Sequence, residues 1–404
     1  MRPLAQIEEP RRVVPAPTQV AVAQPTPLLR LGFRPFYLLA ALAAAVTPAL
    51  WLAMLTSRLD MQPALPASLW HGHEMIFGFV IAAIIGFLFT AGRLWTGLPT
   101  PTGAPLAAFA LLWIAARVAA LTGPYALFLL LDAAFLPLAA AVFFKLVLRS
   151  KNWRNLPMAL LLLLLAAVNL LFHAAQLEWL PVSPSQALQM AVLLIVAVMS
   201  IVAGRVIPSF IGNAAPGSRQ RTLPSIEHAV LPLTTLALLL WFGAPGSRWS
   251  AAAMFALAAL HALRLVLWRP WAAWGRPILS VLPLAYAWIP VGLALLGGAS
   301  LSLVPVSIGI HALGAGAMGT LILGMMSRTA RGHTGRPLQP GQREVWAYRM
   351  VLCGALVRVG GPLAGESTVA VLAVAAILWS GAFVLILSTL TPWLFASRLD
   401  GKAG

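Results

Sequence analysis

The chain has 404 residues, of which 60 % are hydrophobic and only 9 % are charged. Since about 25 % of the residues in a typical globular domain are charged, this composition excludes a soluble protein and indicates helices that face lipid. The net charge of +17 would suggest nucleic-acid binding in a soluble protein. Here the basic residues stand between apolar runs, where they orient a membrane protein and contact anionic lipid headgroups, so we expect no nucleic-acid partner.

The first residues are rich in Pro, Ala, Val and Gln and lack the basic start, apolar run and small-residue cleavage site of a signal peptide. We expect residues 1–31 to be a disordered cytoplasmic tail, residues 32–396 to form a single membrane domain and residues 397–404 to form a second cytoplasmic tail. The one cysteine, Cys353, excludes an internal disulfide, and there is no C-x-x-C-H motif for covalent haem attachment.

Hydropathy predicts an all-α polytopic membrane protein with about twelve transmembrane helices, because a spanning helix needs about 20 mostly apolar residues. Turns rich in Gly and Pro, such as 123–124 and 181–184, separate the apolar runs. The predicted helices lie near 36–57, 74–96, 104–121, 125–148, 156–178, 186–208, 228–243, 249–268, 277–297, 302–326, 345–363 and 367–395.

The distribution of basic residues predicts the orientation of these helices. The termini and the loops on the same side carry 18 Lys and Arg residues, whereas the opposite side carries only Arg58 and Arg248. The positive-inside rule therefore predicts a multi-pass membrane protein with both termini cytoplasmic.

Histidines are the most informative polar residues inside the predicted spans, because each intramembrane polar group is costly. At about 1.5 Å of rise per residue, five of the seven lie in the outer half or the middle of the bilayer. A single histidine is most simply explained by a helix-to-helix hydrogen bond, but five on one side favour a metal or haem site. The five are His71, His73, His173, His261 and His311; His228 and His333 lie at the cytoplasmic face.

The string W-H-G-H-E-M at residues 70–75 is the densest group of candidate ligands. His71 and His73 can face one metal only if the helix begins non-helically at Gly72, because on a regular helix they diverge by about 200°. Met75 lies one turn beyond His71, and a thioether suits Cu(I). The alternative is an interfacial cluster in which Glu74 stabilises the helix N-terminus.

Small residues surround His311 in the run 311–319. They would admit a flat group such as haem, or simply another helix, which is commoner. Arg264 follows His261 by one turn and either pairs with a haem propionate or, more simply, extends to the cytoplasmic surface. Arg117 is harder to dismiss, because its side of the membrane has almost no other basic residue, and Asp132 is its expected partner.

The chain resembles the NnrS family, a group of bacterial membrane proteins described as containing haem and copper. The motifs W-H-x-H-E-M and G-H-T-G-R-P are the specific ones. The stretches that carry the resemblance are Gly32–Tyr37, Trp70–Phe79, Gly204–Phe210, His261–Arg264, and His311–Thr320 with Gly332–Leu338.

The resemblance implies a haem- and copper-binding protein that acts in nitric oxide metabolism, denitrification or resistance to nitrosative stress. It implies haem b and copper as cofactors and nitric oxide or a related small molecule as the partner. It leaves open whether the protein turns over nitric oxide, senses it or carries electrons, and it identifies no redox partner and no ligand residues.

Depth and chemistry suggest the ligands. His261 and His311 differ by about 5 Å in depth, as two axial ligands on facing helices must, so we expect them to hold haem, with His173 in reserve and Arg264 nearby. We expect His71 and His73, completed by Met75 or His173, to bind copper near the outer surface.

Two other functions compete with this interpretation. A twelve-helix secondary transporter of a small solute or metal has the same layout, but the halves of the chain show no convincing similarity to each other. A copper-insertion protein would use the 71–75 cluster without haem. A visible spectrum of the purified protein distinguishes these functions.

Overall fold

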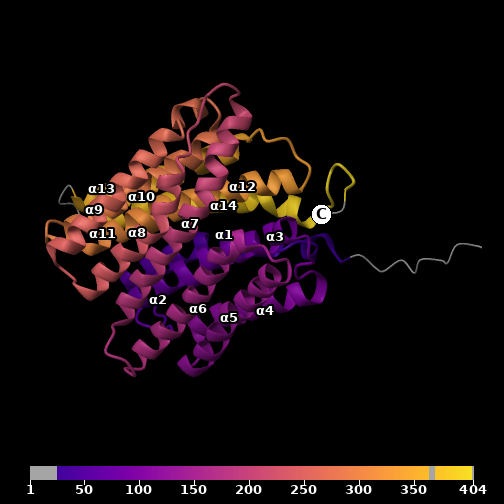
Figure 1. Ribbon diagram of the computed structural model, residues 1–404. Helices are drawn as coiled ribbons and strands as arrows, with labels where there is room; N and C mark the ends of the chain where they lie inside the picture. The colour runs from indigo at the N-terminus through magenta and orange to yellow at the C-terminus, as the bar shows by residue number, and fades with distance from the viewer. Residues whose placement is uncertain (1–24, 364–368, 403–404) are drawn as a thin grey trace, which may run out of the picture.

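Short turns built on Gly, Pro and Ser separate the helices of the computed structural model, which describes residues 25–363 and 369–402. Gly123 and Pro124 alone connect one pair of long helices. Another helix begins with a capping box, in which Ser183 Oγ accepts from the Gln186 amide at 3.2 Å and Gln186 Oε1 accepts from the Ser183 amide at 2.9 Å. The described residues contain helices and no strand, which confirms the predicted all-α class (Figure 1).

The first half of the chain runs through six long segments, the second of which is divided by a π-helix, η2. Three short 3-10 turns, η1 (Pro27–Leu29), η3 (Trp153–Asn155) and η4 (Pro270–Ala273), lie outside the long helices. The segments are α1 (Phe33–Leu55), α2 (Ala67–His73) with η2 (Glu74–Val80) and α3 (Ile81–Thr96), α4 (Gly103–Thr122), α5 (Tyr125–Arg149), α6 (Leu156–Gln176) and α7 (Pro184–Ala214).

The second half contains six more segments, and a π-helix, η5, divides the fourth of them. The segments are α8 (Pro224–Gly243), α9 (Arg248–Leu267), α10 (Pro277–Ser300), α11 (Val306–His311) with η5 (Ala312–Gly319) and α12 (Thr320–His333), α13 (Gln342–Leu363) and α14 (Val369–Phe395). Eleven of the twelve described segments are long and apolar enough to cross a membrane. The exception is α13, which carries Arg343, Glu344, Arg349 and Arg358.

Both π-helices begin at the residue that follows a histidine. The π-helix η2 starts after His73, and η5 starts after His311. Each π turn shifts the side chains that follow it to a different face of the helix, and π segments occur frequently at functional sites. The spans that carry His71, His73 and Met75 and that carry His311 are therefore also the two with irregular backbones, whereas His173 and His261 lie on the regular helices α6 and α9.

The helices form two flanking groups around a shared centre. In Figure 1, α4, α5 and α6 pack in sequence on one flank, and α8, α9 and α10 pack together on the other. Between them α1 contacts α3 and α14, α7 contacts α6 and α10, and η5 contacts α10 and α13. This arrangement brings the tenth and eleventh segments together and places the second segment against α1 and α7, of which α7 also contacts η5.

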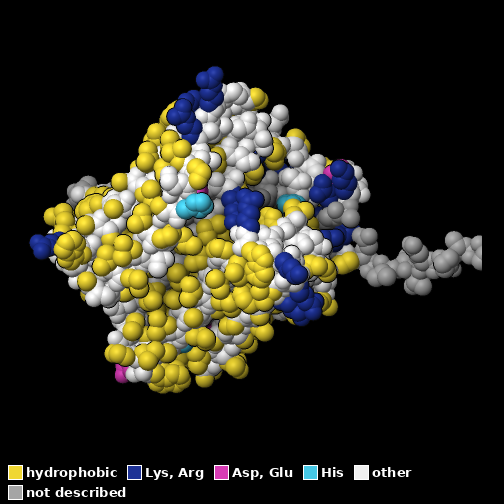
Figure 2. Space-filling view, viewed as in Figure 1, with side chains coloured by type: hydrophobic (Ala, Val, Ile, Leu, Met, Phe, Trp, Pro, Cys, Tyr) yellow, Lys and Arg dark blue, Asp and Glu magenta, His cyan; other side chains and the backbone are white. Residues whose placement is uncertain are grey.

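The start of the first helix and the end of the last helix meet at one end of the bundle. Arg34 Nη1 donates to the carbonyl oxygens of Leu394 and Ala396, both at 2.8 Å. Figure 2 shows hydrophobic side chains over the middle of the visible face and most of the visible basic side chains along its upper and right sides. Of the two predicted tails, residues 1–24 and 403–404 lie outside the described residues.

Candidate functional site

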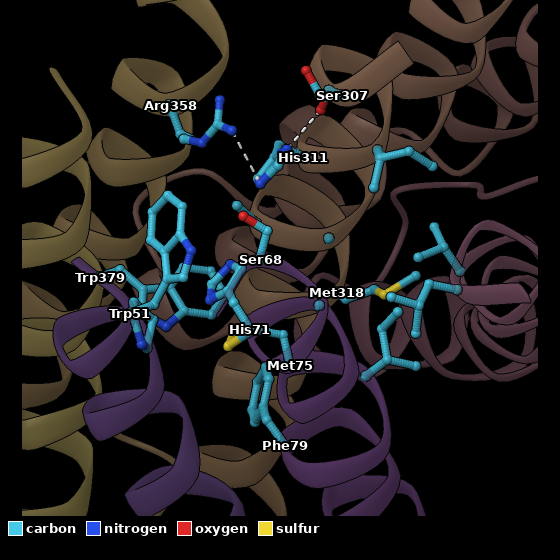
Figure 3. A pocket seen from close by; sticks show the side chains of 18 of the residues that line it. Trp51, Ser68, His71, Met75, Phe79, Ser307, His311, Met318, Arg358 and Trp379 are labelled. Carbon is cyan, nitrogen blue, oxygen red and sulfur yellow. Dashed lines mark hydrogen bonds between the residues drawn. The ribbon is translucent and has the colours of Figure 1, made fainter. Parts of the chain in front are cut away.

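A cavity of about 410 Å³ opens between the helices at the end of the bundle opposite the termini. Its walls come from α1, α2, η2, α7, α11, η5, α13 and α14, and most of its lining is apolar. Figure 3 shows His71 and His311 directed into the same space, with Trp51 and Trp379 beside it. Two predicted ligands from distant parts of the sequence thus line one cavity.

His71 lies flat against an aromatic wall of this cavity. Its ring stacks on Trp51 with the ring centroids 4.7 Å apart and an interplanar angle of 29°. The Nδ1 atom is buried and has no hydrogen-bond partner among the described residues. Because an unpaired buried polar atom costs free energy, this imidazole has a bonding capacity that the protein itself does not use.

His311 is held by two hydrogen bonds on the other side of the cavity. Its Nδ1 atom lies 2.6 Å from the carbonyl oxygen of Ser307, which can only accept, so Nδ1 carries the proton. Its Nε2 atom is then an acceptor and lies 3.1 Å from Arg358 Nη2 (Figure 3). An arginine of α13 therefore occupies the lone pair with which His311 would bind a metal.

The glycines around His311 serve two purposes. A Cβ atom on Gly316 would collide with Trp288, and one on Gly319 would collide with Trp379, so these two positions allow close helix packing. At Gly314 no neighbouring heavy atom lies within 4 Å of a Cβ position, and this residue lines the cavity. The helix-packing interpretation holds for Gly316 and Gly319, whereas Gly314 leaves space open.

A second, fully buried group joins His73, Asp132 and His173 from three different helices. Asp132 Oδ2 lies 3.2 Å from His73 Nε2 and 3.0 Å from His173 Nε2. The donor atoms of the three residues lie within 4.8 Å of one another. Donor atoms at such spacings can share a metal ion that is about 2 Å from each of them.

Further polar side chains orient both imidazoles of this group. The Tyr125 hydroxyl lies 2.9 Å from His173 Nδ1, and Glu74 Oε1 lies 3.3 Å from His73 Nδ1. Asn169 Nδ2 donates to Asp132 Oδ2 at 2.7 Å. Partners on the Nδ1 atoms leave the Nε2 atoms facing Asp132, which is how metal-binding histidines are commonly supported, although His73 Nε2 also lies 3.2 Å from Asn169 Oδ1.

Arg117 provides the positive charge for the two buried carboxylates. Its guanidinium pairs with Asp132, as the sequence predicts, and its Nη1 atom lies 3.4 Å from Glu74 Oε1. With neutral histidines, two carboxylates and one guanidinium sum to one net negative charge. One proton or one monovalent cation would make the group neutral.

His261 lies in neither of these places. Its Nδ1 atom is 2.6 Å from the Tyr286 hydroxyl, and it is absent from the cavity lining. Arg264 is buried as well: it donates to the Ser200 carbonyl at 2.9 Å and pairs with Glu227. It neither extends to the surface nor reaches the cavity that His311 lines.

The residues of the two predicted ligand sets therefore lie in three separate places, which are the cavity, the buried group and the surroundings of His261. The copper set of His71 and His73 needs a non-helical start at Gly72, and this prediction is wrong because α2 is regular through His73. On a regular helix the two histidines face different surroundings. Met75 lines the cavity with His71. His173 joins His73, but His71, the third residue of that form of the predicted copper set, lies elsewhere, and His261 and His311 are not brought together.

Two residues of the cavity, Trp51 and Arg358, are absent from the predicted site. Arg358 stands 16 residues after the start of α13, in the half of that helix nearer its predicted outer end. Arg117 is a sequence-based candidate because it stands near the predicted outer end of its own helix, where basic residues are scarce. The same scarcity of basic residues near the predicted outer ends of the helices also indicates Arg358.

Comparison with known families identifies the chain over most of its length. A family model described as NnrS protein matches residues 27–398. No curated protein matches the chain.

Proposed function

The chain belongs to the NnrS family, and from this premise we propose that it binds haem b and copper in the bacterial inner membrane and acts on nitric oxide. The observation that carries the proposal is the apolar cavity into which His71 and His311 both point (Figure 3). The process it would serve is nitric oxide metabolism or resistance to nitrosative stress. The 18-to-2 distribution of basic residues supports cytoplasmic termini.

The residues of the cavity fit haem. Its lining is mostly apolar, the Nδ1 atom of His71 is buried without a partner, and Gly314 leaves open space in the opposite wall. We assign His71 as the first iron ligand, because no protein group competes for it. Arg358 is a cation available to a propionate. Haem iron, when bound, would supply ligation of a diatomic molecule and one-electron redox chemistry.

His311 has a different part in this proposal. Its Nε2 atom already accepts from Arg358, so it can ligate iron only if that hydrogen bond breaks. If the bond persists, His311 holds Arg358 at the cavity wall, where the remaining N–H groups of Arg358 can donate to a small bound ligand. Nitric oxide or a related small molecule fits this role.

The buried group of His73, Asp132 and His173 fits copper. Two imidazole nitrogens and a carboxylate oxygen converge there, and imidazole is a suitable ligand for copper. The net negative charge of the group with Arg117 and Glu74 favours a monovalent ion, because Cu(I) would leave no net charge in the apolar interior. Of the copper ligands predicted from the sequence, His73 and His173 belong to this group, whereas His71 and Met75 line the cavity instead.

The H-x-H spacing then has a simple explanation. On a regular helix two residues that are two positions apart face different sides. His71 faces the cavity and His73 faces the buried group, so α2 forms part of both proposed sites. The residues between these sites belong to one rigid helix, which would hold the two cofactors at a fixed separation.

A visible spectrum of the purified full-length protein tests the proposal. We expect a Soret band of b-type haem in the parent protein, a loss of about tenfold or more in bound haem in His71→Ala, and no loss in the matched control His261→Ala. Nitric oxide should shift the Soret band of the reduced protein. A folded parent protein without haem would reject the proposal and favour the secondary transporter.

A further inference from the structure

A second cavity, of about 350 Å³, lies at the end of the bundle where the termini meet. It opens between the last turns of α3, the η3 turn and α7. Two arginines line it, Arg154 from η3 and Arg205 from α7, and no Asp or Glu is among its lining residues. Arg205 belongs to the G-R-V-I-P-S-F stretch, to which the proposed haem and copper sites give no role.

Arg205 is fixed in place by neutral acceptors. Its Nη1 atom donates to Asn155 Oδ1 at 2.7 Å, and its Nη2 atom donates to the Arg154 carbonyl at 2.9 Å. A guanidinium has five N–H donors, so these bonds leave three unused. Neither partner carries a charge, and therefore the positive charge of Arg205 is not compensated within the cavity.

Arg154 adds a second charge to the same space. Its exposed side chain has no hydrogen bond or ion pair in the described parts of the chain. The η3 turn that carries it is tied to the end of α3, because Asn152 Nδ2 donates to the Trp95 carbonyl at 2.7 Å. Two guanidinium groups thus share one cavity without a carboxylate, so an anion bound between them would reduce their mutual repulsion.

Apart from Asn152 and Asn155, the rest of the lining is apolar and lies toward the membrane. Phe87, Val202 and Val206 come from the interior parts of α3 and α7, and Trp95 stacks edge-on against Phe87 with the centroids 5.7 Å apart. A tryptophan at the end of a span is typical of the lipid headgroup level. The cavity therefore has a cationic outer part and an apolar inner part, as a phospholipid headgroup and the start of its acyl chains require.

We propose that Arg154 and Arg205 bind the phosphate of an anionic phospholipid headgroup in this cavity. Guanidinium groups bind phosphate through paired N–H donors, and basic pockets between transmembrane helices on the cytoplasmic side bind such headgroups. A free phosphate ion has the same binding chemistry, but it would leave the apolar inner part unfilled. The proposal is independent of haem and copper.

Native mass spectrometry of the full-length protein tests this proposal, with phosphatidylglycerol, phosphatidylcholine and inorganic phosphate as probes. We expect retained phosphatidylglycerol in the parent, and about thirtyfold less in the double variant Arg154→Gln/Arg205→Gln, which corresponds to about 1 kcal/mol for each basic residue near a membrane surface. Arg93→Gln is the matched control, because this exposed arginine also lies at the end of α3 but does not line the cavity.

Two further variants keep the test decisive. Arg154→Gln alone removes no hydrogen bond of the fold, so it reports on the site even if Arg205 variants unfold. Arg205→Lys keeps the charge but loses the paired donors, and we expect intermediate retention. Equal retention of phosphatidylglycerol by the parent and the Arg154 variant, or equal retention of phosphatidylcholine and phosphatidylglycerol by the parent, would overturn the proposal. Displacement of the lipid by millimolar inorganic phosphate would overturn the assignment to a lipid.

Discussion

Arg358 Nη2 lies 3.1 Å from His311 Nε2, so an arginine of α13 is hydrogen-bonded to a histidine of α11 at the wall of the large cavity. His311 can accept this bond because its Nδ1 proton is donated to the Ser307 carbonyl. The pair fixes the tautomer and the orientation of the ring. It also places a positive charge beside a mostly apolar space.

The first prediction concerns this charge. Arg358→Gln removes a cation beside the proposed haem, so the oxidised form, which carries one more positive charge, becomes relatively more stable and the reduction potential falls. We expect a decrease of about 60 mV, which is a tenfold change for a one-electron couple. Potentiometric titration of the Soret band measures it.

Arg349→Gln is the matched control for this change, since Arg349 is exposed on the same helix and lies outside the cavity lining. Its potential should equal that of the parent. An unchanged potential in Arg358→Gln would place the haem elsewhere.

The second prediction concerns the buried pair of Arg117 and Asp132. Arg117→Leu leaves Asp132 and Glu74 without their cation in a site that excludes water, and breaking a buried pair in this way costs about 3–5 kcal/mol. We expect a marked decrease in the midpoint of thermal unfolding in detergent. Arg93→Gln, an exposed change, should leave the midpoint nearly unchanged.

The helices could be predicted from the sequence because hydropathy acts locally. Each predicted span has a helical counterpart, and the expected partner of Arg117 is its partner in the structure. The ends are less accurate: the second helix begins at Ala67 rather than at 74, because helices continue past the apolar core into the interface. That difference places His71 and His73 on regular helix.

The grouping of the histidines could not be predicted, because it depends on which helices become neighbours. The predicted depths pair His261 with His311 as haem ligands, but depth does not specify which face of a helix a residue occupies. His261 packs on Tyr286, whereas His311 faces a cavity shared with α1, α2 and α13. The π turns after His73 and His311 further change which face the following residues present, and no local pattern in the sequence reveals them.

The third prediction uses the contrast between two glycines of η5. Gly314→Leu places a side chain in open space at the cavity wall, so we expect it to displace haem while the unfolding midpoint stays near that of the parent. Gly319→Ala forces a Cβ atom against the Trp379 ring, so we expect a lower midpoint, at a cost of about 1–3 kcal/mol. Haem content and thermal unfolding are measured on the same samples. Full haem in a folded Gly314→Leu protein would show that the cavity is not the haem site.

The last prediction is that haem and copper are lost independently. His173→Ala removes an imidazole from the buried group but touches no part of the cavity lining, so copper should fall by about tenfold or more while haem stays at the parent level. His71→Ala should do the opposite, since His71 lies outside the buried group. Copper and haem are quantified per protein by elemental analysis and by the pyridine spectrum of extracted haem.

If His71→Ala loses both cofactors while it stays folded, the two metals share one site and α2 does not separate them. If His173→Ala keeps its copper, the network of His73, Asp132 and His173 is a structural hydrogen-bond group, and its charge is balanced by a proton rather than by a metal ion.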